Sequence, residues 1–230
     1  MEIDLIKQQV LEANRRLESS GLVRLTWGNV SGIDRSSGTI VIKPSGVPYQ
    51  ELQKEHLVVL SLDGAKVEGD LNPSSDTPTH LALYKAFPEI GGVAHTHSTY
   101  ATMFAQAGKE IPCFGTTHAD HFSGPVPLAR HLTPEEVAED YEGNTGICII
   151  ERFQGLKPME VPAVLLHQHA PFTWGKDALD ALVNSIALEA VAEMAWGTLL
   201  LNPNAQPLPD HILYKHYQRK HGPGAYYGQK

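Results

Sequence analysis

This chain of 230 residues has few cysteines, no long apolar run and no excess of positive charge. Its two cysteines, Cys113 and Cys148, fit neither a disulfide framework nor a cysteine metal motif. Both lie in apolar stretches, so we expect reduced thiols in the core. No run approaches the roughly 18 apolar residues that a membrane-spanning helix needs. We therefore expect a cytoplasmic protein that does not span a membrane.

The charge balance is acidic, with 18 lysines and arginines against 26 aspartates and glutamates and a formal net charge of −8. This argues against nucleic acid or an anionic membrane surface as a partner, because both bind basic surfaces. Recognition of a phosphate must then be local. Hydrophobic residues make up 42 % of the chain, enough for one sizeable core. We expect a single domain over residues 1–230.

Apolar spacing predicts a mixture of helices and strands. A helix is expected at 3–17, ending at Gly21, followed by short β-type runs at 22–25, 39–42 and 57–62. Asp63-Gly64 predicts a hairpin turn into a further strand at 65–68. Later strands are expected at 91–97 and 161–169, and helices at 81–87, 98–106, from 133 onward, 177–200 and 210–220. Because predicted strands and helices do not alternate strictly along the chain, the pattern predicts an α/β (α+β) fold, a mixed sheet covered by helices on both faces.

Histidine is frequent, at 12 residues, and two His-x-His pairs end predicted strands. His95 and His97 are two residues apart, which puts both rings on one face of a strand and suits chelation of one ion. His167 and His169 form the second pair. Three imidazoles with one open position are typical of a catalytic zinc site. Either pair alone is compatible with packed or surface histidines, and the spacing leaves open which of His167 and His169 binds metal.

Three short polar loops could bind a phosphate through backbone amides: Gly28-Asn29, Ser45-Gly46 and Ser74-Ser75. The third loop opens a predicted helix, whose N-terminal amides and dipole favour an anion. Lys43 could add a cation. Each loop alone is typical of an ordinary turn, and only the three together with a metal site indicate a phosphorylated substrate.

Six stretches together resemble the epimerase branch of the class II aldolase and adducin family. They are 25–31 (LTWGNVS), 43–46 (KPSG), 73–78 (PSSDTP), 95–97 (HTH), 115–120 (GTTHAD) and 220–229 (KHGPGAYYGQ). The resemblance runs nearly end to end. It implies the class II aldolase-like fold, a central, mostly antiparallel mixed sheet, in a homotetramer with active sites between subunits.

The resemblance also implies roles for individual residues. Zinc would be held in each subunit by His95, His97 and His169, with Asp76 beside or on the ion. The substrate-binding residues would be Gly28, Asn29, Lys43, Ser45, Gly46, Ser74, Ser75, Thr116 and His216. Asp120 and Tyr227 would be the acid/base pair, the tyrosine reaching in from a neighbouring subunit. The chain departs from the resemblance at His121, where an aromatic residue is usual.

The activity that the resemblance implies is epimerisation of L-ribulose 5-phosphate at carbon 4, by breaking and remaking the bond between carbons 3 and 4. One alternative is a ketose-phosphate aldolase of the L-fuculose-phosphate type, which is expected to carry glutamate where this chain has Asp76. Another is a non-catalytic, adducin-like binding module. An intact set of His95, His97, His169 and Asp120 argues against the binding module.

Overall fold

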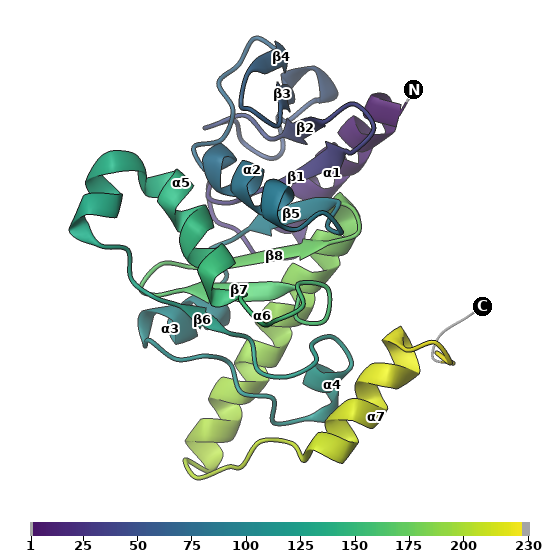
Figure 1. Cartoon of the computed structure of the whole chain (residues 1–230), viewed down its shortest axis with the longest axis vertical. Helices are drawn as coiled ribbons and strands as arrows, with labels where there is room; N and C mark the ends of the chain where they lie inside the picture. Colours follow the sequence, from purple (N-terminus) through teal and green to yellow (C-terminus); the bar gives the residue numbers. More distant parts are fainter. Residues whose placement is uncertain (1, 227–230) are drawn as a thin grey trace.

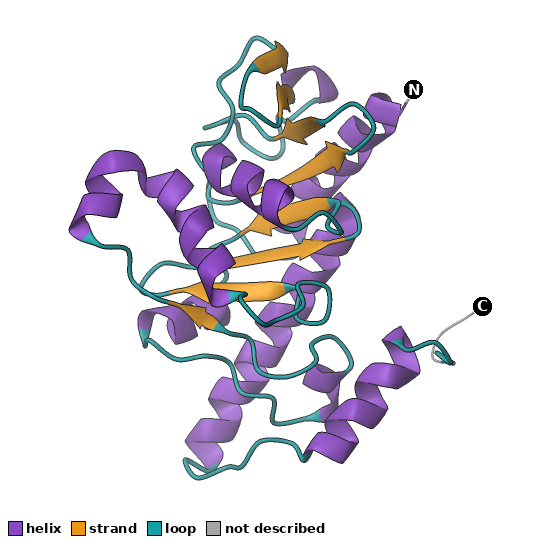
Figure 2. Ribbon diagram, viewed as in Figure 1, coloured by secondary structure: helices purple, strands orange, loops and turns teal. Residues whose placement is uncertain are grey.

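The computed structural model describes residues 2–226, in which one eight-stranded sheet carries helices on both faces (Figure 1 and Figure 2). The strands are β1 (Asn29–Asp34), β2 (Thr39–Ile42), β3 (Val58–Ser61), β4 (Lys66–Glu68), β5 (Gly92–His95), β6 (Leu128–Ala129), β7 (Ala163–Leu166) and β8 (Pro171–Gly175). The helices are α1 (Glu2–Ser19), the short 3-10 helix η1 (Lys54–His56), α2 (Thr77–Ala86), α3 (Thr99–Gln106), α4 (Thr116–Ala119), α5 (Pro134–Arg152), α6 (Ala178–Leu201) and α7 (Asp210–His221).

The sheet runs in the order β4-β3-β2-β1-β5-β8-β7-β6. Every neighbouring pair is antiparallel except β6 with β7, which is parallel. This arrangement confirms the predicted mixed, mostly antiparallel sheet. It also places β1, β5 and β8 next to one another in the middle of the sheet.

Both faces of the sheet are buried, and β2 shows how its sequence achieves this. Ile40 and Ile42 belong to a core cluster with residues of α2 and α5, whereas Val41 belongs to a cluster with residues of α1. Side chains of a strand alternate between faces, so an unbroken apolar run fits a strand covered on both sides. In Figure 1, α2 and α5 lie in front of the sheet and α1 and α6 behind it.

Local capping signals explain several helix boundaries. Gly21 has a φ of +73° directly after α1, and the Leu22 N–H donates to Leu17 O at 3.2 Å, closing the last turn. The Thr133 hydroxyl oxygen accepts the Glu136 N–H at 3.2 Å, and the Glu136 carboxylate accepts the Thr133 N–H at 2.8 Å. This reciprocal pair is the capping box that the sequence predicts at the start of α5.

The strand expected at 22–25 is wrong. Residues 22–28 form a loop, in which Leu25 has a φ of +52° and Gly28 a φ of +90°, and the first strand begins at Asn29. A left-handed backbone cannot continue a strand. The apolar side chains of Leu22 and Val23 fill the α1 cluster from this loop, which accounts for their β-like pattern.

Beyond the sheet, α7 packs against α4 at one side of the molecule (Figure 1). Cys113 and Cys148 are buried free thiols, as expected. Among the described residues, no helix combines the length and the apolar character needed to cross a membrane.

Candidate metal centre

Three histidines converge where β5 ends and β7 turns into β8. One ring nitrogen each of His95, His97 and His169 lies within 4.8 Å of the others, and the ring centroids are 4.9 to 5.1 Å apart. Among the described residues, this is the one group of histidine, cysteine or acidic side chains with that spacing. The structure therefore brings together the residues that the sequence analysis assigned to zinc.

The hydrogen bonding of His95 selects the nitrogen that faces an ion. Its Nδ1 lies 2.9 Å from the carbonyl oxygen of Pro171, so Nδ1 carries the proton and Nε2 keeps its lone pair. That Nε2 is 3.2 Å from Nε2 of His97. Two nitrogens each about 2.0–2.1 Å from a tetrahedral zinc are about 3.3 Å apart. The donor set thus fits a zinc-sized divalent ion.

A tight turn explains why His169 rather than His167 joins this group. β7 ends at Leu166, Gln168 has a φ of +56°, and the His169 N–H donates to Leu166 O at 3.0 Å. The predicted strand over 161–169 is therefore too long, and His167 and His169 do not face the same way. His167 instead packs against His131, with ring centroids 3.7 Å apart and ring planes tilted by 40°.

Burial keeps the imidazoles of His97 and His169 neutral. It lowers the pKa of His97 and of His169 to about 4 in each case, with His95 adding to the effect. Neutral imidazole is the form that binds a metal ion. Both of these rings are therefore in their metal-binding form at neutral pH.

Asp76 lies in the same pocket, at the position before α2. Its Oδ2 accepts a hydrogen bond of 2.6 Å from the Asn29 amide, and that amide also donates to the Ser74 hydroxyl oxygen at 3.0 Å. Burial by itself would raise the pKa of Asp76, but His95, His80 and the Asn29 hydrogen bond lower it below its usual value. Asp76 is thus an ionised carboxylate held next to the three histidines.

Two of the predicted phosphate loops are fastened to each other. Pro44 and Pro73 form an isolated antiparallel bridge, the Ser74 N–H donates to Lys43 O at 3.0 Å, and the Ser45 N–H donates to Asn72 O at 3.0 Å. Loops so joined present the side chains of Ser45 and Ser74 on one rim.

Lys43 is buried beneath these loops. Its Nζ donates to Pro44 O at 3.2 Å and lies 4.8 Å from the centroid of the Tyr49 ring. Burial lowers the pKa of Lys43 to about 8. A buried ammonium gains from an anion beside it, so this lysine favours a phosphate in the pocket.

The histidines and the loops line one cavity of about 390 Å³. Eleven of the predicted site residues line it: Gly28, Asn29, Lys43, Ser45, Gly46, Ser74, Ser75, Asp76, His95, His97 and His169. Gly28 is required by close packing, because a Cβ there would lie 2.6 Å from His95 O. One cavity thus contains both the three histidines that suit a metal ion and the loops predicted to bind a phosphate.

Thr116, Asp120 and His216 lie elsewhere, since none of these three described residues lines this cavity. Thr116 begins α4, and Asp120 follows it. Asp120 Oδ1 accepts a hydrogen bond of 3.1 Å from His216 Nδ1. Arg219 of α7 donates from Nε to Oδ1 at 3.0 Å and from Nη2 to Oδ2 at 2.6 Å. Burial raises the pKa of Asp120, but Arg219 and His216 lower it below its usual value overall. Tyr227 lies outside the described residues.

His121, where the chain departs from the family resemblance, adds no positive charge beside Asp120. Burial, Lys220 and His221 lower the pKa of His121, so the ring is neutral at neutral pH.

Comparison with known proteins agrees with this geometry. The family profile described as Class II Aldolase and Adducin N-terminal domain matches residues 8–196. The chain belongs to the class II aldolase and adducin family. Within it, the chain is 54 % identical over 225 residues to proteins of Salmonella paratyphi C and Salmonella typhi named L-ribulose-5-phosphate 4-epimerase UlaF, covering 98 % of this chain and 99 % of each relative. A solved structure of L-fuculose 1-phosphate aldolase superposes with a TM-score of 0.82 at 25 % identity, over 93 % of this chain and 95 % of the other.

This class II aldolase family member has further pocket residues that the sequence analysis missed. Trp27, Tyr141 and Glu142 also line the cavity. Trp27 adjoins the predicted Gly28-Asn29 loop, and its ring centroid lies 6.3 Å from that of His97. Tyr141 and Glu142 reach the pocket through a break inside α5 at Asp140. The local signals of that break are the cap-type residue Asp140 and Gly143, which the sequence analysis did not use.

A buried polar network behind the histidines was also missed. Ser31 Oγ lies 2.7 Å from His80 Nδ1 and 2.8 Å from Tyr84 Oη, and His80 and Tyr84 are fully buried. If Tyr84 donates to Ser31 and Ser31 donates to His80, every hydroxyl proton has an acceptor. His80 then carries its proton on Nε2.

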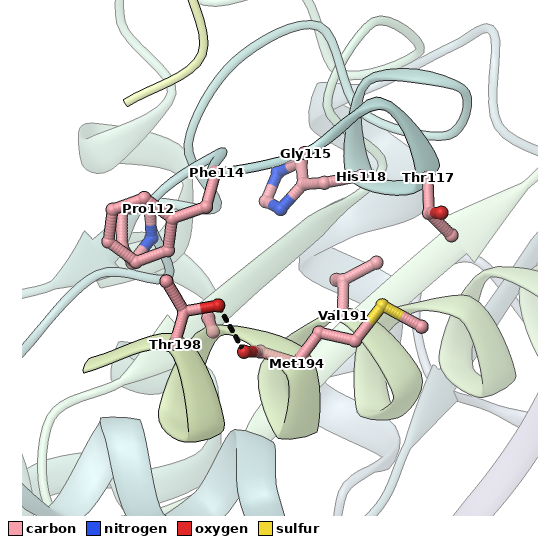
Figure 3. Close-up of a pocket in the computed structure, with 9 residues that line it drawn as sticks. Pro112, Phe114, Gly115, Thr117, His118, Val191, Met194 and Thr198 are labelled. Carbon is pink, nitrogen blue, oxygen red and sulfur yellow. Dashed lines mark hydrogen bonds between the residues drawn. The ribbon is translucent and has the colours of Figure 1, made fainter. Parts of the chain in front are cut away.

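Figure 3 shows a separate cavity of about 260 Å³ between the loop before α4 and α6. Its walls include Phe114, Val191 and Met194, and His118 is its one ionisable residue. Nε2 of His118 lies 2.8 Å from Gly124 O. With one imidazole in an apolar wall, this cavity offers neither a metal-binding group nor a cation for phosphate.

Proposed function

We propose that this chain converts L-ribulose 5-phosphate into D-xylulose 5-phosphate by breaking and remaking the bond between carbons 3 and 4. The observation that carries the proposal is the single cavity that joins His95, His97 and His169 to the fastened loops around Ser45 and Ser74. A sugar with a carbonyl near one end and a phosphate at the other matches these two halves. The 54 % identity to proteins named for this activity supports the same substrate.

The chemistry explains why a carbon–carbon bond is broken. Carbon 4 is not next to the carbonyl at carbon 2, so its C–H bond is not acidified and simple proton abstraction there is slow. Removing the proton of the carbon-4 hydroxyl instead turns that carbon into an aldehyde, while the electron pair of the broken bond stays on carbon 3. Rotation of the tethered two-carbon phosphate, followed by bond formation on its other face, gives the epimer.

Each group of residues has a task in that sequence. The loops at Gly28, Ser45 and Ser74, with Lys43, hold the phosphate so that the two-carbon fragment does not leave. A divalent ion, which we propose to be zinc, supplies Lewis-acid charge at the carbonyl half when it is bound. Asp76, ionised and adjacent, balances that charge.

We assign proton transfer at the carbon-4 oxygen to Asp120 and Tyr227, one for each face of the aldehyde. Asp120 is ionised through Arg219 and His216, which is the form that accepts a proton. Because Asp120 does not line the cavity of its own chain, we propose that it and His216 serve the cavity of a neighbouring chain in a homotetramer. We propose a cytoplasmic location as well, in keeping with two buried free thiols.

A second candidate function is cleavage alone, with release of both fragments, and the likeness to L-fuculose 1-phosphate aldolase favours it. One assay separates the two. Purified, zinc-loaded protein is mixed with L-ribulose 5-phosphate, and the products are followed by NMR. The proposal expects D-xylulose 5-phosphate with at most traces of free glycolaldehyde phosphate and dihydroxyacetone. Stoichiometric release of those fragments would establish an aldolase instead.

A further inference from the structure

Tyr141 reaches the cavity because α5 is broken just before it. Asp140 has non-helical dihedral angles, φ −160° and ψ 89°, and its Oδ1 accepts the Gly143 N–H at 3.1 Å. Asp140 therefore acts as an N-cap for the second half of α5. A Cβ at position 143 would overlap the Asp140 carboxylate, so glycine is needed there.

The break turns Tyr141 toward the metal-binding end of the pocket. The ring centroid of Tyr141 lies 6.3 Å from that of His169, and its carbonyl oxygen accepts the Thr145 hydroxyl at 2.8 Å. Tyr141 and His169 also line a second, smaller cavity of about 180 Å³. Tyr141 thus forms part of the wall between the two cavities.

The phenol of Tyr141 is a hydrogen-bond donor at neutral pH. Burial, Glu142 and Asp76 together raise the pKa of its hydroxyl above the usual value. Tyr141 and Asp76 line the same cavity. A neutral phenol in that place can pair with a substrate hydroxyl.

The proposed substrate has one polar group that no residue discussed so far binds. With the carbon-5 phosphate in the loops and the carbonyl and carbon-3 hydroxyl at the histidines, the carbon-1 hydroxyl would lie on the side of the histidines away from the loops. Tyr141 belongs to α5, which contributes nothing to the phosphate loops, and it borders His169. We propose that Tyr141 is a specificity-determining residue that hydrogen-bonds the carbon-1 hydroxyl of the ketose phosphate, an inference that rests on the proposed function.

A double-mutant-type cycle of two substrates and two proteins tests whether Tyr141 binds the carbon-1 hydroxyl. The substrates are L-ribulose 5-phosphate and its 1-deoxy analogue, which lacks only the carbon-1 hydroxyl, and the proteins are the wild type and Tyr141→Phe. One neutral hydrogen bond corresponds to about 3- to 10-fold in kcat/KM. Either change alone should cause that loss, and the two together should cause no further loss. Tyr100→Phe, a half-exposed tyrosine of α3 outside the cavity, should leave all values unchanged.

Positioning by the helix break gives a second readout. Asp140→Ala removes the cap and should raise KM for L-ribulose 5-phosphate but not for the 1-deoxy analogue, with zinc content unchanged. Asp140→Asn keeps a side-chain oxygen at the cap and should restore the wild-type value.

The possible outcomes separate this inference from the proposed function. If the wild type epimerises L-ribulose 5-phosphate but Tyr141→Phe loses equally on both substrates, or on neither, the assignment of Tyr141 is overturned while the function stands. A zinc-loaded wild type that does not epimerise L-ribulose 5-phosphate would refute the proposed function and this inference with it.

Discussion

Replacing Gly28 by alanine tests the close approach between the first phosphate loop and the first histidine. Gly28 has a φ of +90°, and an added Cβ would lie 2.6 Å from His95 O and 3.0 Å from a Val23 methyl carbon. The left-handed backbone costs alanine about 1–2 kcal/mol. Forced overlap in a packed site costs about 1–3 kcal/mol more. Gly28→Ala should therefore lower the free energy of unfolding by about 2–5 kcal/mol.

Gly38→Ala is the matched control, because it shares the strain and lacks the overlap. Gly38, in the turn between β1 and β2, has a φ of +66° and no atom within 4 Å of an added Cβ. It should lose only about 1–2 kcal/mol. Urea unfolding of the metal-free proteins, at one protein concentration, measures both losses.

The same pair of variants should differ in zinc binding. Displacing the His95 carbonyl shifts the backbone that carries the His95 ring, so Gly28→Ala should weaken zinc in a competition titration, whereas Gly38→Ala should not. Equal destabilisation by the two substitutions, together with equal zinc affinity, would refute the reasoning about close packing.

Four further predictions concern the pocket and its surroundings. Ser75→Ala should raise KM with little change in kcat, since a phosphate handle is held alike in the ground and transition states; an unchanged KM counts against the phosphate assignment. His97→Ala should lose zinc on dialysis, as metal analysis would show, and retention of zinc would exclude His97 as a ligand. Asp120→Asn should lower kcat by about 10²–10⁴ at normal zinc content, and near-normal turnover would remove Asp120 from the mechanism. Burial lowers the pKa of His80 to about 3 and of His118 to about 4, from 6.5 in the unfolded chain. Unfolding therefore takes up protons below pH 6.5, and the free energy of unfolding of the metal-free protein should fall as the pH drops from 6.5 toward 4. A free energy of unfolding in urea that does not change over this pH range would contradict these shifts.

The sequence predicts those parts of the fold and site that depend on neighbours along the chain. The capping box at Thr133 and the His95-Thr-His97 spacing are local patterns, and the structure contains both. The apolar run at 22–25 shows the limit of such patterns. A buried loop and a strand present the same residues, and only the φ of Leu25 distinguishes them.

Other features depend on distant contacts and could not be read from spacing. The choice between His167 and His169 rests on a left-handed turn at Gln168, a residue type that does not signal such a turn. Tyr141 enters the cavity through a break that depends on the pairing of Asp140 with Gly143. The resemblance to a known family supplied the assignment of His169, which the periodicity of the strand left open.

The central claim, that this family member epimerises through cleavage of the bond between carbons 3 and 4, is tested most directly by running the reaction in D₂O. Zinc-loaded protein is given L-ribulose 5-phosphate, and the D-xylulose 5-phosphate formed is analysed by NMR for deuterium at carbon 4. Cleavage and re-formation never break the C–H bond at carbon 4, so the account predicts that this position keeps its proton. Deuterium at carbon 4 in the product would show direct deprotonation there and would contradict the account.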